Sequence, residues 1–181
     1  GYFMDPSDVG IYNAATPIVG LMAIIPVMFS QLFFPLITRH FSQKKYSIIK
    51  ELSKQVGKWV FILDLPVFIL MFLFPGAIIN LFFGKEYIFA ENVLRILSIG
   101  GVFSSFTFLL TDLMSMVGKS KLIFYNIAIA SLINILLDFL LIKRYGIEGA
   151  AIATTIVWII LTMALLIEVK YYVHFIPLRR K

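Results

Sequence analysis

Long apolar runs, separated by short polar segments, make up most of this chain. Each run is long enough to cross the hydrocarbon core of a bilayer as an α-helix, which takes about 20 residues. The pattern therefore predicts an all-α integral membrane protein with a single membrane domain. Its five predicted transmembrane helices are residues 8–37, 59–83, 87–117, 122–142 and 149–171.

The segment between the first two runs, residues 41–58, has a different pattern. Apolar residues recur on one helical face, and Lys50, Lys54 and Lys58 follow one another at four-residue spacing on another face. A basic amphipathic helix is typical of a segment that lies in the headgroup plane of a membrane and contacts anionic lipid. A solvated loop is the alternative interpretation.

A polar stripe follows one helical face of the third run. Steps of three, four or seven residues connect Glu91, Arg95, Ser98, Ser105 and Asp112, and the spacing of Glu91 and Arg95 predicts an ion pair. At ~1.5 Å per residue the stripe is roughly 30 Å long, the thickness of the hydrocarbon core. A charge in lipid costs at least ~2.5 kcal/mol, so this face should meet protein or water. Two interpretations remain: the stripe lines a passage, with Arg95, Ser98 and Ser105 in its wall, or it is a buried packing seam.

Other polar residues interrupt the apolar runs at isolated positions. Asn13 in the first run and Asn134 in the fourth are candidates for lining the same cavity as the stripe, although Asn13 also suits helix packing. Acidic residues within membrane spans are candidates for carrying a proton or binding a coupling cation. The positions that fit are Asp64, Asp112 and Asp138.

The composition supports a membrane protein and excludes several chemistries. Hydrophobic residues make up 60% of the chain, and its mean hydropathy of +0.94 is far above that of a soluble domain. There is no cysteine, which excludes disulfides and thiol catalysis. No glycine-rich phosphate loop is present, and His40 and His174 are isolated, so we predict no metal, no cofactor and no enzyme. An intramembrane aspartyl enzyme built on Asp112 and Asp138 stays open as an alternative.

The net charge of +6 comes from basic residues between the apolar runs, a placement that reflects membrane topology and not nucleic-acid binding. Twelve basic residues fall on one side of the predicted membrane and three or four on the other. The positive-inside rule then predicts that the N-terminus lies outside and the C-terminus in the cytoplasm. Because the chain opens on Gly1 and lacks a signal-peptide pattern, we expect a further span upstream. The larger group is Arg39, Lys44, Lys45, Lys50, Lys54, Lys58, Lys119, Lys121, Lys170, Arg179, Arg180 and Lys181, and the smaller is Lys85, Lys143 and Arg144, with Arg95 slightly inside the membrane.

Five short motifs, in order along the chain, resemble those of one transporter family. They are the helix start Val9-Gly10-Ile11-Tyr12-Asn13-Ala14-Ala15, then Phe34-Pro35-Leu36-Ile37, Leu81-Phe82-Phe83-Gly84-Lys85-Glu86-Tyr87, Gly118-Lys119, and Tyr145-Gly146-Ile147-Glu148-Gly149-Ala150-Ala151-Ile152-Ala153-Thr154. Together they resemble the polysaccharide-export flippases of the multidrug/oligosaccharidyl-lipid/polysaccharide exporter superfamily.

The resemblance implies a fold and an activity. Members have two six-helix lobes related by a pseudo-two-fold axis, and they move a polyprenyl-diphosphate-linked oligosaccharide across the cytoplasmic membrane by alternating access. This chain is similar to most of the second lobe, from its second helix onward. The implied partners are membrane lipid, the lipid-linked glycan and a missing N-terminal lobe, or a second copy in its place.

Two other functions remain open at this stage. A drug or metabolite antiporter of the same superfamily has the same kind of spans and the same acidic coupling candidates. A structural membrane subunit, from a different class, uses its polar stripes only for assembly.

Overall fold

The computed structural model describes residues 6–174, with side chains from 9 to 172, and the described part is helical with short turns and no strand. Four helical segments are long and apolar enough to cross a membrane: Val9–Ser42, Tyr46–Leu73, Lys85–Met116 and Ser120–Tyr172. The elements are α1 (Pro6–Gly20), the 3₁₀ segment η1 (Leu21–Ala23), α2 (Ile24–Ser42), α3 (Tyr46–Leu73), α4 (Pro75–Phe83), the 3₁₀ segment η2 (Lys85–Ala90), α5 (Glu91–Met116), α6 (Ser120–Val169) and the short π-helical segment η3 (Lys170–His174).

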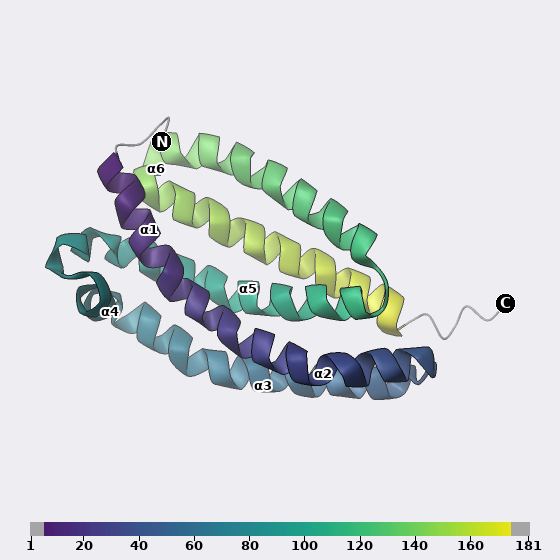
Figure 1. Cartoon of the computed structure of the whole chain (residues 1–181). Coiled ribbons are helices and arrows are strands. Elements are labelled where there is room, and N and C mark those ends of the chain that lie inside the picture. Colours follow the sequence, from purple (N-terminus) through teal and green to yellow (C-terminus); the bar gives the residue numbers. More distant parts are fainter. Residues whose placement is uncertain (1–5, 175–181) are drawn as a thin grey trace.

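Helix α5 lies in the middle of an elongated bundle, with α2 and α3 on one side and α6 on the other, and α1 crosses it from the α6 side (Figure 1). Two adjacent glycines let its neighbours approach closely. A side chain at Gly100 would collide with Trp158 and Thr155 of α6, and one at Gly101 would collide with Met22 of η1. Small residues at such contacts are a common device of helix packing in membranes.

The buried apolar residues form two clusters, one toward each end of the bundle. The first joins α1, α3, α4, α5 and α6 around Ile79, Leu94, Leu97 and Ala151. The second joins α2, α3, α5 and the end of α6 around Ile49, Met114 and Leu165. Both clusters depend on α5, so this helix holds the bundle together along its length.

The structure differs from the sequence prediction at residues 41–58. Helix α2 continues to Ser42, and the basic segment from Tyr46 onward is the first half of α3, continuous with the apolar second half. The composition changes near Trp59, but no residue there stops a helix. The separate helix predicted for 41–58 is therefore wrong as an element, because a change from basic to apolar side chains does not interrupt backbone hydrogen bonding.

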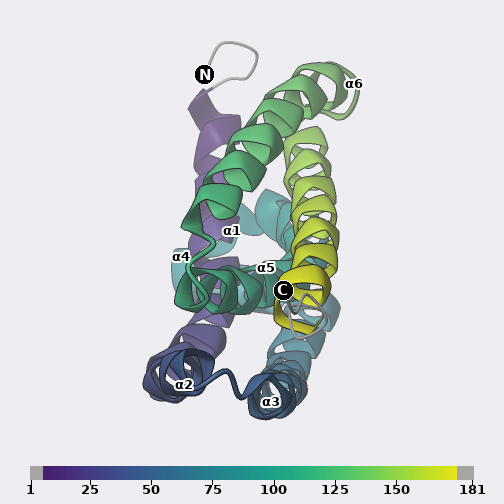
Figure 2. The same ribbon diagram turned by 90° about the vertical axis from the view of Figure 1, so that its right-hand side faces the viewer.

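Helix α6 has 50 residues, and its two arms, 120–145 and 147–169, run side by side (Figures 1 and 2). The chain reverses at Gly146, whose φ of 56° and ψ of −135° suit glycine far better than other residues. At the far end of the arms, the Asn126 amide donates a 2.8 Å hydrogen bond to Glu168. The break between the predicted fourth and fifth spans is thus a single residue, Gly146, whose backbone is not helical.

Replacing Gly149 by Ala should destabilise this hairpin. An added Cβ would lie 2.3 Å from the Leu141 carbonyl oxygen on the opposite arm, so the arms must separate. Overpacking of this kind costs about 1–3 kcal/mol. We expect a lower melting temperature in detergent, whereas Gly10→Ala, with open space around its Cβ, should leave it unchanged or slightly higher. Equal melting temperatures for the two variants would contradict the close approach of the arms.

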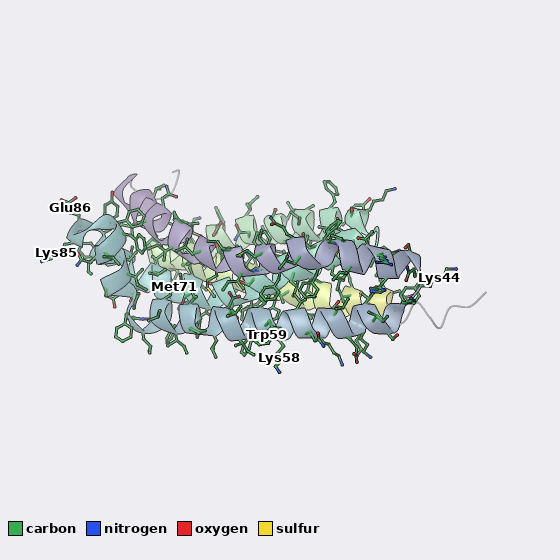
Figure 3. All side chains as sticks on the ribbon, turned by 60° about the horizontal axis from the view of Figure 1, so that its bottom comes forward. Lys44, Lys58, Trp59, Met71, Lys85 and Glu86 are labelled. Carbon is green, nitrogen blue, oxygen red and sulfur yellow. The ribbon has the colours of Figure 1, made fainter. Side chains whose placement is uncertain are left out.

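Basic residues lie at both ends of the described bundle, and Lys58 lies near the middle of α3 (Figure 3). Lys44, in the α2–α3 connection, is at one end, and Lys85 is at the other, beyond α4 (Figure 3). The α5–α6 turn lies at the same end as Lys44, where Lys119 sits 4.4 Å from the centre of the Tyr172 ring (Figure 1). The side chain of His174 and the basic tail Arg179, Arg180 and Lys181 lie outside the described residues.

Candidate functional site

Arg95 forms the centre of a polar network near the start of α5. Its guanidinium pairs with Glu91 at 2.7 Å, which confirms the ion pair predicted from their spacing. It also donates to the Asn92 side chain and to the Phe72 carbonyl at the end of α3, each at 3.3 Å. Asn92 in turn donates to Glu148 of α6 at 2.9 Å. The network thus joins three helices, while Arg95 and Glu91 each keep 38% of the side chain exposed.

The middle of the polar stripe faces the interior of the bundle. Ser98 and Ser105 are fully buried. Ser98 donates to the carbonyl of Arg95 on its own helix, and Ser105 donates to Met22 at 3.3 Å. Met22 lies in η1, where the first span departs from α-helical geometry, so Ser105 provides a partner for a carbonyl at that break. This arrangement is typical of a packing seam; the cavity-lining role of the two serines stays a prediction.

Asp112 lies at the opposite end of the stripe from Arg95. Its carboxylate accepts a hydrogen bond from Ser30, a buried residue of α2. Asp112 also lines a shallow surface groove of about 420 Å³ on α2, together with Gln31 and Pro35. The structure therefore gives this acid both a partner and access to the molecular surface.

Asp64 has neither. It is 1% exposed on α3, and neither carboxylate oxygen has a hydrogen-bond partner among the described residues. The Ser105 hydroxyl lies near the carboxylate, but it donates its hydrogen bond to the Met22 carbonyl. An isolated ionised carboxylate in an apolar interior is very costly, so Asp64 must take up a proton or a cation, or move.

A third acid, Asp138, lies one turn along α6 from Asn134, which lines a mainly apolar groove between the two arms. The groove has a volume of about 320 Å³, and Ser131, Asn134, Thr154 and Trp158 contribute to its lining. One carboxylate oxygen of Asp138 is buried and has no hydrogen-bond partner in the described structure.

Tyr12 of α1 connects with this groove. Its hydroxyl lies 3.0 Å from that of Thr154, and Asp138 is near enough to Tyr12 to interact with it electrostatically. Asn13, the next residue of α1, is exposed together with Thr16 one turn on. The structure thus brings Asn134 and Asp138 to one region, and it keeps Arg95, Asp64 and Asp112 at three separate positions along the bundle.

Metal binding has no geometric support in the described part of the chain, where no three His, Asp or Glu side chains come together. The acids discussed above are each alone. Only a proton, or a cation bound largely by backbone and hydroxyl oxygens, suits such single carboxylates.

Comparison with known proteins identifies the family. The MatE family matches residues 1–140 of the 181. The chain belongs to the MatE family. This match confirms the predicted relationship to the multidrug/oligosaccharidyl-lipid/polysaccharide exporter superfamily.

Curated relatives of this MatE chain carry names from glycan transport and biosynthesis. A putative O-antigen transporter of Shigella flexneri is 30% identical over 84% of this chain and 36% of its own length. A capsular polysaccharide biosynthesis protein, CapF, of Staphylococcus aureus is 32% identical over 81% of this chain and 37% of its own. A probable low-salt glycan biosynthesis flippase, Agl15, of Haloferax volcanii is 24% identical over 86% and 33%.

This MatE chain therefore spans about a third of the length of the curated relatives that it matches. No solved structure matches it significantly. The four long apolar helices and the family together show a multi-pass membrane protein.

Sequence reasoning missed several residues that the structure places in the polar regions of this MatE chain. They are Tyr12, Asn92, Thr154 and Trp158. A signal for two of them was present, since Tyr12 belongs to the first of the five motifs and Thr154 to the last. Their hydroxyl groups are in contact, so the first and last of the five motifs meet in the fold although these two residues are 142 positions apart in the chain.

Proposed function

We propose that this chain is part of a flippase that moves a polyprenyl-diphosphate-linked oligosaccharide across the plasma membrane by alternating access. The observation that carries the proposal is the MatE match, together with relatives named for O-antigen transport, glycan flipping and capsule synthesis that each align with over four fifths of the chain. A transport role and not a catalytic one is part of this proposal, and the relatives named transporter and flippase support it.

The architecture supports one lobe of a two-lobe transporter. Counting the two arms of α6 separately gives five spans, most of a six-helix repeat, and repeat-built transporters bind substrate where the repeats meet. Polar side chains are exposed on apolar helices at Asn13, Thr16, Gln31 and Ser131. Since polar groups facing lipid are costly, we infer that a second lobe, or a second copy of this one, covers them.

We assign a different role in transport to each of the polar regions. The groove between the arms of α6 offers amide and hydroxyl groups at Asn134, Ser131 and Thr154 to sugar hydroxyls. Arg95, partly exposed, offers a cation to the diphosphate. Asp64 is the strongest candidate for coupling, because it alone combines complete burial with two oxygens that lack a partner in the described structure.

Transport of the glycan is tested in cells that depend on the natural protein for surface polysaccharide. Arg95→Ala should reduce the amount of exported glycan more than Lys143→Ala, a loss of the same charge elsewhere at the same end of the bundle. Arg95→Lys should retain part of the activity, because it keeps the charge and loses the two-nitrogen contact with Glu91 and Asn92. Undiminished export by Arg95→Ala, with lipid-linked glycan distributed normally between leaflets, would argue for a different substrate.

The orientation is tested by labelling. We place the end with Lys45 in the cytoplasm and the end with Lys85 outside, since twelve of the basic residues belong to the first group. Cysteines introduced at these two positions in the cysteine-free chain should react with an impermeant thiol reagent from opposite sides of the membrane. Reaction of both from the same side would contradict this placement.

A further inference from the structure

A cavity of about 220 Å³ lies between helices at the basic end of the bundle. Helices α2, α3, α5 and the end of α6 surround it, and its lining is almost wholly apolar, with Phe33, Val56, Leu109 and Leu113 among its residues. The volume is below the ~300–1,000 Å³ of a pocket for a whole small molecule. It suits part of one hydrocarbon chain.

A second, polar hollow adjoins the first. It is lined by Ser47, Ile48, Lys50, Glu51 and Lys54, and has a volume of about 320 Å³. Lys50 and Lys54 line both spaces, so the two hollows adjoin at these side chains. Both lysines are exposed, and within the described structure neither is within ion-pair distance of a carboxylate.

We propose that the two hollows together bind one anionic phospholipid, with its phosphate between Lys50 and Lys54 and part of one acyl chain in the apolar cavity. The proposal rests on the membrane location of the chain and not on the transported substrate. It gives the basic half of α3 a specific ligand in place of a general attraction to negative membrane surface.

The depth of the site fits a lipid already in the bilayer. Trp59, which is 53% exposed, follows Lys58 near the middle of α3 (Figure 3). Exposed tryptophans on membrane helices favour the level of the headgroups. Lys54 is five residues nearer the basic end, roughly 7 Å at ~1.5 Å per residue, which is the level of phosphate groups if Trp59 marks the interface. The cavity residues Val56 and Gly57 lie between Lys54 and Trp59 in α3, just inward of the phosphate level.

Charge selects among anionic lipids. The polar hollow contains two lysines and one glutamate, a net charge of +1 at neutral pH. One positive charge matches a phosphodiester with a single negative charge, such as that of phosphatidylglycerol. A diphosphate carrier brings more negative charge close to Glu51, so we assign the site to a membrane phospholipid and not to the lipid-linked glycan.

The test uses the protein that carries this chain, purified and delipidated, with native mass spectrometry of bound phosphatidylglycerol and phosphatidylcholine of equal chain length. Unmodified protein should prefer phosphatidylglycerol about tenfold or more, since each lysine near an anionic lipid contributes about a fivefold effect. Lys50→Gln with Lys54→Gln should remove that preference. The matched control is Lys44→Gln with Lys45→Gln, which removes the same charge at the same end but does not line either hollow.

Filling the apolar cavity tests the tail separately. Gly57→Leu projects a side chain toward Leu109, where a Cβ alone meets only an ordinary 4.0 Å contact, so the fold should tolerate it. We expect it to weaken binding of both lipids, whereas Gly10→Leu, on open surface, should weaken neither. A normal elution volume in gel filtration confirms that each variant is folded.

Three results would overturn the site. Equal loss of preference in both lysine pairs would indicate a diffuse surface potential. Unchanged lipid binding in Gly57→Leu would show that the tail lies elsewhere. Displacement of phosphatidylglycerol by polyprenyl diphosphate at equal concentration would assign the site to the carrier lipid.

Discussion

Replacing Asp64 by Asn should abolish glycan transport and at the same time raise the melting temperature of the protein. The residue is 1% exposed, and both its oxygens lack hydrogen-bond partners among the described residues. A carboxylate held in this way must exchange a proton or a cation with water during a transport cycle, or it remains a permanent cost to the fold. Asparagine has nearly the same shape but cannot ionise, so it removes the exchange and much of the cost of burial together.

The two effects separate a coupling role from a structural one. Because an unpaired buried charge is costly, a neutral residue of nearly the same shape at position 64 should be neutral or stabilising. If Asp64 has no role, the Asn variant should be stable and transport at the full rate. If Asp64 is needed for packing, the variant should be unstable and little of it should reach the membrane. Loss of transport to the level of an empty vector, in a protein of normal or higher melting temperature, is expected only for coupling.

Asp112 provides the matched control, because it is an acid of the same type with a partner. Its carboxylate accepts a hydrogen bond from the buried Ser30. Asp112→Ala leaves that hydroxyl without its acceptor, which should lower the free energy of unfolding by about 1–3 kcal/mol. The substitutions at 64 and 112 should therefore shift the melting temperature in opposite directions. A lower melting temperature for Asp64→Asn would contradict the absence of a partner at that carboxylate.

This contrast shows how far the sequence could lead. Asp64, Asp112 and Asp138 are indistinguishable as acids in apolar runs, and the sequence predicts the same coupling role for all three. What separates them is the presence of Ser30 opposite Asp112, a contact across 82 residues of chain. Local periodicity contains no information on such contacts, so the ranking of the acids required the structure.

The helices themselves were more predictable, for a physical reason. A run of about 20 apolar residues has few options other than a membrane helix, because its backbone must satisfy its own hydrogen bonds in lipid. Boundaries set by composition were less reliable, as the unbroken helix α3 across Trp59 shows. The middle of the α5 stripe was predicted correctly as a face that meets protein, since Ser98 and Ser105 are buried. Its pattern alone does not distinguish a passage from a packing seam, because both exclude lipid.

The 181 residues by themselves should not flip any lipid-linked glycan. In the proposed two-lobe transporter, alternating access comes from one lobe moving against the other around a site at their interface. In this structure the residues suited to that interface, among them Asn13 and Gln31, are exposed on apolar helices and are not covered by a second lobe. An isolated lobe in a bilayer must therefore aggregate or pair through these faces.

Reconstitution tests this expectation directly. In liposomes containing a fluorescent polyprenyl-diphosphate oligosaccharide, the purified chain should give no more flipping than protein-free vesicles. Co-expression with a first lobe from a MatE relative should restore flipping, and Asp64→Asn should then remove it again. Gln31→Leu makes the exposed face of α2 more apolar. It should improve the recovery of the chain on its own, because the glutamine amide is unfavourable next to lipid. It should weaken the reconstituted pair, because the amide contacts the other lobe. Flipping by the chain alone, at a dilution where cross-linking finds only monomers, would mean that one lobe encloses the whole path.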